Sequence, residues 1–244
     1  MSVEVRRGSV RFVTRGEGRT TRHSFSFGDH YDPENVGFGP MVCHDDHLLG
    51  GGTGFPDHPH RDLEIVTWVL SGAVVHTASV GPPSTVGAGQ VQVLSAGSGI
   101  SHSEIAEPGA GATRFIQTWV RPDESGAAPS YASAVVGDAV AAGGGLVPVV
   151  SGRDSAAVAR IGTASATLHA AVLDAGESVS LPDDPLQHVF VATGSLARFS
   201  LAEPLSAGDA LRIDDRPGLS VTAASPTQLL VWSFTTPRVV SVCP

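Results

Sequence analysis

The sequence predicts an all-β protein built from two similar barrels in succession. Its 29 glycines and 17 prolines favour many turns and short strands over long helices. In the first half, apolar and β-branched runs recur about every 8–12 residues and are separated by Gly or Pro, as in a β-barrel or sandwich. A related order of strands and turns recurs in the second half, and such a repeat indicates two copies of one unit.

The N-terminal part of the chain mixes one expected strand with a segment rich in His, Phe and Asp. Residues 3–13 alternate roughly and are expected to form the strand. Phe25 and Phe27 are two positions apart, which suggests one buried face. His23 and His30 could be metal ligands, but a hydrogen-bonded structural role is the expectation for both.

The rest of the first half is read as a series of strands. The expected strands are residues 40–49, 63–70, 73–80, 91–94 and 113–120. Asp45 and Asp46 are expected at a turn or rim, because carboxylates are rarely buried without partners. The segment 63–70 (LEIVTWVL) is expected to be a buried strand, and it turns at Ser71-Gly72 into its return strand.

Two pairs of metal-competent side chains, His58 with His60 and His102 with Glu104, are the candidate functional residues. The members of each pair are two positions apart, so in an extended strand they point to the same face. A barrel can bring the two pairs together. Three imidazoles and one carboxylate around one point form a metal site with room for water or substrate. A single His-x-His is usually a surface feature, but two pairs in glycine-rich settings predict a mononuclear metal site.

Proline 59 refines the expected location of the first pair. Pro59 cannot donate a hydrogen bond to a neighbouring strand, so it indicates a strand start or a sheet edge. That placement suits a ligand segment that leads into the buried strand at residues 63–70.

The chain is expected to divide into two domains, an N-terminal metal-binding barrel at residues 1–125 and a C-terminal barrel at residues 134–244. The Pro-, Ser- and Ala-rich residues 122–133 are read as the linker. When the turns of the two halves are matched, the four candidate ligands fall on Ser180, Pro182, Val221 and Ala223. The second barrel is therefore expected to lack metal ligands, and His169 and His188 are interpreted as ordinary strand residues.

Composition limits the classes of partner and compartment. The net charge is −9 and there is no basic run, which argues against direct nucleic-acid binding. Two distant cysteines, Cys43 and Cys243, do not make a disulfide framework, so a reducing compartment is expected. No apolar run is long enough for a membrane span, and residues 1–12 lack the apolar core of a secretory signal. The expectation is a cytoplasmic protein without a membrane partner.

Specific runs resemble a known family. Gly52, His58, His60 and Glu64 follow the spacing of the first cupin motif, although the closing Gly72 comes one residue late. The second cupin motif also departs, because its histidine comes two residues late. The runs GFPDHPHR (54–61) and SAGSGISHSE (95–104), with FSF at 25–27 and YDP at 31–33, are more specific. They resemble pirins, most closely the bacterial pirin-like proteins with quercetin 2,3-dioxygenase activity.

The resemblance implies a bicupin with one metal ion in the N-terminal barrel. Its ligands would be His58, His60, His102 and Glu104, and Glu64, a ligand in many other cupins, would not be one. Glu64 is four residues after His60, which places it on the same face of an extended strand, so we expect it to be a carboxylate or hydrogen-bond acceptor that supports the ligands. Fe(II) is favoured by the resemblance, whereas Ni, Mn, Co, Cu or Zn also suit such a ligand set. Because the two halves of a bicupin mimic a cupin dimer, a monomer is expected.

The implied activity is a dioxygenase that opens the C-ring of a flavonol such as quercetin with dioxygen and releases carbon monoxide. Glu104 would act as the base that removes the proton of the substrate's 3-hydroxyl. One alternative is a redox-sensing metal protein that acts through a protein partner. Another is a barrel that the metal only stabilises, because closed four-ligand sites are structural and open ones catalytic.

Overall fold

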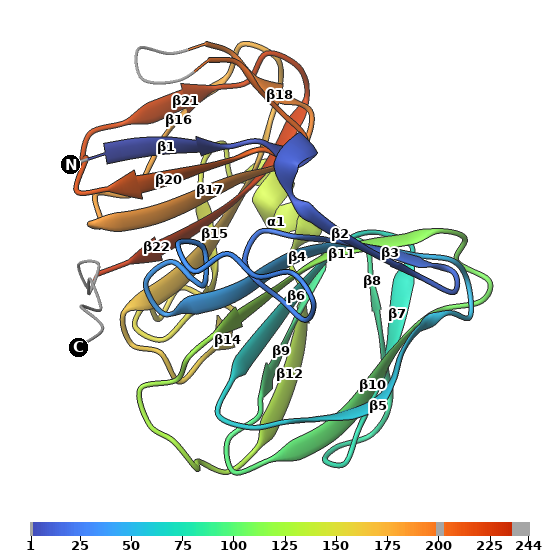
Figure 1. The fold of residues 1–244 in the computed structure, drawn as a ribbon. Coiled ribbons are helices and arrows are strands. Elements are labelled where there is room, and N and C mark those ends of the chain that lie inside the picture. The colour runs from blue at the N-terminus through green and yellow to red at the C-terminus, as the bar shows by residue number, and fades with distance from the viewer. Residues whose placement is uncertain (1, 199–202, 236–244) are drawn as a thin grey trace.

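The computed structural model describes residues 2–198 and 203–235 and confirms the all-β prediction (Figure 1). The first part contains β1 (Ser2–Arg6), η1 (Gly8–Val10), β2 (Phe12–Gly16), β3 (Arg19–His23), β4 (Met41–Leu49), β5 (Gly54–His60), β6 (Glu64–Ser71), β7 (Ala73–Ala78), β8 (Ser84–Gly87), β9 (Gln90–Ser95), β10 (Ile100–Ala106), β11 (Thr113–Val120) and β12 (Ser130–Val135). The second part contains α1 (Gly137–Ala142), β13 (Val147–Ser151), β14 (Ala159–Arg160), β15 (Ala166–Leu173), β16 (Ser178–Ser180), β17 (Leu186–Thr193), β18 (Ser195–Leu196), β19 (Leu205–Ser206), β20 (Ala210–Asp214), β21 (Ser220–Thr222) and β22 (Thr227–Phe234).

The first half is a barrel-like sandwich of two sheets. One sheet has seven strands in the order β12-β9-β6-β11-β4-β3-β2, and the other has four in the order β5-β10-β7-β8. β5 is an edge strand of the smaller sheet, which confirms the edge expected for Pro59. The space between these two sheets holds the candidate metal ligands.

Strand β6 is buried on both of its faces, as its nearly continuous apolar sequence predicts. Ile65 packs inside the barrel with residues of β9 and β10. Val66 and Trp68, which point to the opposite face, belong to a separate core cluster that also includes residues of the second half. One strand thereby supports the barrel interior and the contact between the halves.

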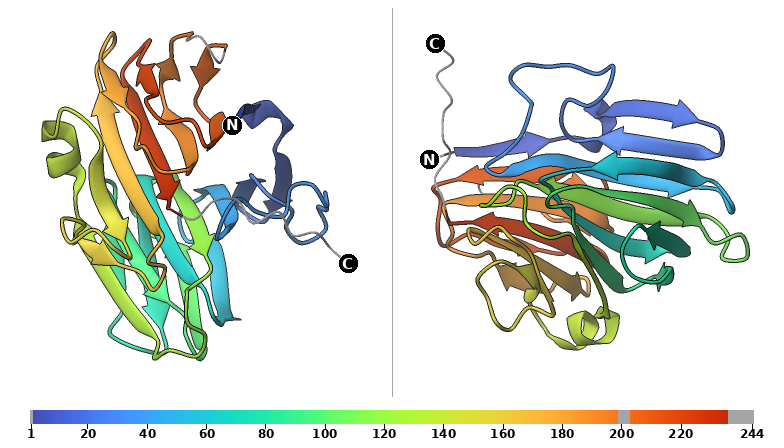
Figure 2. Two further views of the ribbon diagram at one scale, coloured as in Figure 1. Left: turned by 90° about the vertical axis from the view of Figure 1, so that its left-hand side faces the viewer. Right: turned by 90° about the horizontal axis from the view of Figure 1, so that it is seen from below.

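Each half contributes one seven-stranded sheet to the contact between the halves, and these two sheets pack face to face (Figure 2). The second sheet has the order β1-β20-β17-β22-β15-β13-β14. Phe190 and Trp232 from this sheet share one core cluster with Trp68 and Ile116 from the first. The Trp232 indole N–H also donates to Thr118 Oγ1 across the contact, at 3.2 Å. The buried indole thus combines apolar packing with a satisfied polar atom.

The interior of the second half is apolar where the first half carries its candidate ligands. β16 pairs with β21, and Val179 lies opposite Val221, as His58 lies opposite His102 in the first half. The sequence comparison of the two halves matched His58 with Ser180. In the observed register the equivalent residue is Val179, so that match is wrong by one residue. Val179 and Val221 are both buried in the apolar cluster of this half. An interior of this kind offers no ligand atoms at those positions.

The N-terminal segment differs from its prediction. Residues 3–13 do not form one strand, because η1 separates β1 from β2. β1 pairs with β20 and therefore belongs to the sheet of the second half (Figure 1). The predicted linker also contains the start of β12, which pairs with β9. The division into residues 1–125 and 134–244 stays a prediction.

The prediction that Asp45 and Asp46 lie at a turn or rim is wrong. Both carboxylates are buried within β4, and each has a basic partner. The His23 ring Nδ1 lies 2.7 Å from Asp45 Oδ2, and Asp46 accepts two hydrogen bonds of 2.9 Å from Arg114. Paired, hydrogen-bonded carboxylates can be buried in a strand. The structural role expected for His23 is confirmed.

Two further expectations concern the neighbourhood of that strand. Phe25 is buried, but Phe27 is 41% exposed, so the expected common buried face is wrong because the chain leaves the strand after β3. His30 stacks on the Phe12 ring.

Cys43 is a free, buried thiol, and Cys243 lies outside the described residues. Within residues 2–198 and 203–235, no helix has the length and apolar character needed to span a membrane.

Candidate metal centre

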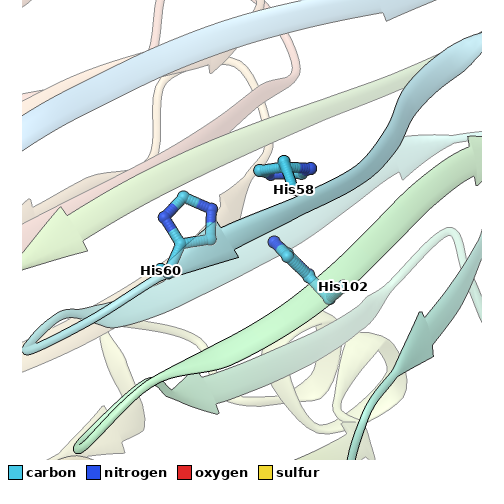
Figure 3. Close-up of side chains that lie close together, drawn as sticks. All are labelled: His58, His60 and His102. Carbon is cyan, nitrogen blue, oxygen red and sulfur yellow. The ribbon is translucent and has the colours of Figure 1, made fainter.

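Strands β5 and β10 hold the three histidines of the candidate site. The two strands are antiparallel neighbours, and His58 lies directly opposite His102. His60 follows two residues along β5 and returns to the same face, as the spacing predicts. Figure 3 shows the three rings converging from the two strands.

The three imidazoles form a group whose ligand nitrogens all lie within 4.8 Å of one another. The ring centroids of His58 and His102 are 4.5 Å apart, and the centroid of His60 lies 4.8 Å and 5.0 Å from theirs, respectively. Imidazole nitrogen is a good ligand for Fe, Ni, Cu and Zn ions. The geometry therefore brings together three of the four predicted ligands.

The hydrogen bonds of the rings leave one nitrogen free on at least two of them. His58 Nδ1 lies 2.8 Å from the Pro56 carbonyl oxygen, so this nitrogen carries the proton and Nε2 keeps its lone pair. His102 Nδ1 lies 3.1 Å from His76 Nε2. His102 Nε2 is buried and has no hydrogen-bond partner among the described residues. A metal ion would satisfy this buried nitrogen, so the residues fit such an ion.

Burial keeps two of the three imidazoles, those of His60 and His102, neutral. Desolvation lowers the pKa of His60 to about 4, and the nearby His58 ring lowers it further in the same direction. Desolvation likewise lowers the pKa of His102 to about 3, with added effects of the surrounding rings. Because a metal binds the neutral imidazole, both rings are ready to act as ligands at neutral pH.

Glu104 is not part of the group of three, but it lies beside it in the barrel interior. Gln92 Nε2 donates to its Oε1 and Gln117 Nε2 to its Oε2, each at 2.7 Å. Burial raises the pKa of Glu104, whereas the hydrogen bond from Gln117 and the charge of His58 lower it. The carboxylate is thus fixed by two amides while it interacts electrostatically with one ligand ring.

A chain of polar side chains connects Glu104 to the ligand His102. The His76 ring, whose Nε2 contacts His102, stacks on the Tyr131 ring with centroids 4.4 Å apart. The Tyr131 hydroxyl donates to Gln92 Oε1 at 3.1 Å, and Gln92 in turn holds Glu104. Partners of this kind orient ligands and set their tautomers.

These supporting residues were not predicted, although the sequence contains a weak signal for some of them. Thr67, Gln92 and Gln117 are polar residues within otherwise apolar strand runs, and all three are buried. A buried polar residue needs a partner, and here each of them reaches Glu104. No sequence pattern pointed to His76, because its contact with His102 depends on the pairing of β7 with β10.

His76 is expected to control metal affinity without binding the metal. In His76→Phe the stack on Tyr131 can persist, but the acceptor for the His102 Nδ1 proton is lost. We expect metal affinity to fall by about 10–100-fold, as for other partners that orient a ligand. Competition with a fluorescent chelator measures the affinity. His76→Gln, which restores an acceptor oxygen, should recover part of the loss, and equal losses in both variants would contradict this role.

The placement expected for Glu64 is wrong. Glu64 Oε2 accepts a hydrogen bond from Ser95 at 2.5 Å, and its pKa is also affected by a hydrogen bond with the backbone of Gly162 in the second half. The side chain therefore faces the contact between the halves rather than the three imidazoles. The alternation of faces does not continue from His60 to Glu64, because the chain turns at Asp62, which has a φ of 50°.

The histidines of the second half are separate from the metal centre. His169 Nε2 lies 3.2 Å from Ser233 Oγ, within β15 and its neighbour β22. His188, in β17, lies beside the ring of His44 in the first half. Among the described residues, neither belongs to a group of three or more potential ligands.

An open depression of about 550 Å³ borders one of the three imidazoles, His60. Its other lining residues include Pro59 and Ser101, which alternate with the histidines along β5 and β10 and so point to the opposite face of the sheet. The Trp119 indole also meets the His60 ring, with centroids 4.9 Å apart. His58 and His60 are only half-buried, so the group of three is accessible to a small molecule, which is a property of catalytic rather than closed structural metal sites.

Comparison with known proteins identifies the family. Residues 5–120 match the model of the Pirin family. A Mycobacterium tuberculosis protein, provisionally named a quercetin 2,3-dioxygenase, is 42% identical over 236 residues, which cover 96% of this chain and 95% of that protein. The chain belongs to the pirin family. A quercetin 2,3-dioxygenase of Escherichia coli is 42% identical over 109 residues, which cover 45% of this chain and 47% of that protein.

A solved pirin structure agrees with the fold and with the presence of a metal site in the family. The bacterial pirin of Escherichia coli in complex with nickel(II) is 30% identical and superimposes with a TM-score of 0.85, covering 97% of this chain and all of that chain. The bicupin architecture implied by the sequence resemblance is thereby confirmed. For this pirin, the His58, His60 and His102 group is the candidate metal centre.

The lowered pKa values of the pirin's buried histidines predict a pH-dependent stability of the metal-free protein. Burial lowers the pKa of His47, His60 and His76 to about 4 and that of His102 to about 3. An unfolded histidine titrates near 6.5, so between about pH 6.5 and 4 the unfolded chain binds more protons than the fold. Stability should therefore fall as the pH drops through this window.

Two buried carboxyls act in the opposite direction. Burial raises the pKa of Glu64 and Glu104, so their contribution is lost as the pH rises above the unfolded value. Because the four imidazoles outnumber these two carboxyls, we expect the urea midpoint of chelator-treated protein to be lower at pH 5 than at pH 7. An unchanged midpoint would contradict the neutral state assigned to the rings.

Proposed function

We propose that this pirin is a metal-dependent dioxygenase that opens the C-ring of quercetin-like flavonols. The observation that carries the proposal is a solvent-accessible group of three imidazoles, one of them with a buried nitrogen that has no hydrogen-bond partner among the described residues. The names of the relatives from Mycobacterium tuberculosis and Escherichia coli support the reaction class. The protein would be an enzyme of the oxidoreductase class.

The proposed ligands of one divalent metal ion are His58, His60, His102 and Glu104. The buried carboxylate of Glu104 would supply the negative charge that imidazole ligands lack, and its electrostatic interaction with His58 supports its place in the set. Fe(II) is the proposed native metal, on the resemblance to the family. Ni, Mn, Co, Cu and Zn also suit the donor atoms, and the Escherichia coli pirin was solved with nickel(II).

The proposed reaction consumes one flavonol and one dioxygen and gives a ring-opened ester and carbon monoxide. Glu104 takes the proton of the 3-hydroxyl, and its contribution to the rate would be about 10²–10⁴-fold. Gln92 and Gln117 hold both of its oxygens and so fix the direction from which it meets the substrate. When bound, the metal would supply Lewis acidity and a route for electrons to dioxygen.

The half-exposed side of the His58 and His60 rings is the proposed place of the aromatic substrate. We propose that only residues 1–125 bind metal and that residues 134–244 form the second barrel, because buried valines fill the equivalent positions there. We also propose a cytoplasmic monomer without a nucleic-acid or membrane partner. The extensive core between the halves supports the monomer, and the net charge of −9 argues against nucleic acid.

The proposal is tested with protein purified without added metal and then reconstituted anaerobically with Fe(II). We expect one metal per chain, oxygen uptake that depends on quercetin, and carbon monoxide as a product. Metal binding without uptake for any flavonol would overturn the dioxygenase proposal and direct attention to the redox-sensing alternative. No bound metal would overturn the site itself.

A further inference from the structure

A second cavity, of about 240 Å³, lies where the N-terminal segment passes between the two halves. Its wall is formed by residues around η1, by the loop that follows β3, and by β17 and β20. In Figure 1 this is the region where the chain descends from β1 through η1 to β2. None of the described residues that line it belongs to the candidate metal centre.

The wall of this cavity is rich in arginine. Arg6, Arg7, Arg11 and Arg212 line it, whereas Asp32 is the one carboxylate among its described lining residues. Arg6 and Arg7 are paired with acidic residues outside the wall, Glu4 and Asp209. In a protein with a net charge of −9, a cavity with this lining is a local exception.

Arg11 is buried without a close carboxylate of its own. Its side chain is 5% exposed, and its Nη1 lies 3.9 Å from Asp46 Oδ2. That carboxylate already accepts two hydrogen bonds of 2.9 Å from Arg114. Arg11 Nη2 donates to Ser24 Oγ and to the His44 carbonyl oxygen, but Nε and Nη1 have no hydrogen-bond partner among the described residues. Two of the three guanidinium nitrogens therefore lack the acceptors that normally offset desolvation.

His188 contributes a second unsatisfied donor to the same wall. It is 1% exposed, and neither ring nitrogen has a hydrogen-bond partner among the described residues. Burial lowers its pKa well below the ordinary value, so the ring is neutral and carries a single N–H. Its ring faces that of His44, with centroids 4.6 Å apart. An acceptor atom is therefore the group that this wall lacks.

Arg212 lies next to His188 in the wall, because the two residues are paired across β17 and β20, and it is held in a fixed position. Its Nη1 donates to Asn35 Oδ1 at 2.8 Å, and its Nη2 donates to the Ser24 carbonyl oxygen at 3.2 Å. Its guanidinium also lies 4.3 Å from the centroid of the Phe25 ring. This side chain adds fixed positive charge to the cavity.

We propose that this cavity binds a small oxyanion, a carboxylate or phosphate group of a low-molecular-weight compound. The anion would accept hydrogen bonds from Arg11 and His188 and be stabilised by the charge of Arg212. Guanidinium groups suit planar and tetrahedral oxyanions, and a metal cation would be repelled by them. Val10 and Phe12 also line the cavity, so an apolar part of the ligand has surface to contact. This site is independent of the proposed dioxygenase activity.

The test is titration of the full-length, metal-loaded protein with sodium benzoate and with inorganic phosphate, at constant ionic strength and with chloride as the reference. Calorimetry and thermal unfolding are the readouts. We expect saturable binding of one anion per chain and a rise in Tm. Binding of benzoate alone, or of phosphate alone, supports the site and tells which class it prefers.

Two variants connect the binding to the cavity. Arg11→Gln should weaken it by at least roughly tenfold, because a charge-assisted hydrogen bond is lost. Asn35→Asp keeps the acceptor for Arg212 but places a carboxylate in the cavity, and it removes the amide N–H that donates to the Ser24 carbonyl oxygen. This variant should lose the anion even if Arg11→Gln does not fold, and a cooperative thermal transition without the anion checks that it is folded.

The controls separate this site from the surface and from the metal. Arg15 is exposed and outside the wall, so Arg15→Gln should bind the anion as the wild type does. His58→Ala should also retain anion binding. If the anion bound to the metal ion instead of the cavity, this variant would lose it. Absence of saturable binding, persistence of full binding in Asn35→Asp, or its loss in His58→Ala would each overturn the proposal.

Discussion

Replacement of His58 or His102 by alanine is expected to abolish metal binding and, with it, quercetin-dependent oxygen uptake. Each variant removes one of three imidazoles whose nitrogens lie within 4.8 Å of one another. Loss of a partner that only orients a ligand costs about 10–100-fold in affinity, so loss of a ligand itself should exceed roughly 100-fold. The metal content per chain and the rate of oxygen uptake measure the effect.

A matched substitution in the second half provides the control. His169 also lies in a strand and makes one side-chain hydrogen bond, to Ser233, but it is distant from the group of three. His169→Ala should keep one metal per chain and the wild-type rate of uptake. Full metal content in both His58→Ala and His102→Ala would refute the proposed centre.

Substitution of Glu104 is expected to have the second largest effect. Glu104→Ala should weaken metal binding more than Glu64→Ala, because Glu104 lies beside the imidazoles whereas Glu64 faces Ser95 and the second half. The alanine variant also leaves two buried amide donors without an acceptor, at a cost of about 1–3 kcal/mol each. Metal titration and the free energy of unfolding should therefore both be measured.

Glu104→Gln separates the role of a base from that of a structural partner. Glutamine keeps the shape of the side chain and one acceptor oxygen, but it cannot take a proton at neutral pH. We expect kcat to fall by about 10²–10⁴-fold with a smaller loss of metal than in the alanine variant. A greater loss of metal in Glu64→Ala than in Glu104→Ala would show that the ligand assignment is wrong.

The central part of the candidate site could be predicted because it depends on local spacing. His58 and His60 are two residues apart in one strand, so they share a face whatever the rest of the fold does. The same rule fails for Glu64, because the turn at Asp62 resets the alternation. Asp45 was misplaced for a related reason: its burial depends on His23, which reaches it from a neighbouring strand.

The amino-acid sequence by itself determined the all-β class, the bicupin repeat and the identity of the three histidines, because these follow from periodicity, spacing and specific runs. The tertiary structure decided which groups support them. His76 and Tyr131 meet only because β7 and β12 enter different sheets that pack against each other. It also placed β1 in the sheet of the second half and closed the arginine-lined cavity around Arg11. Contacts between residues far apart in the chain depend on strand order and register, and local patterns do not contain that information.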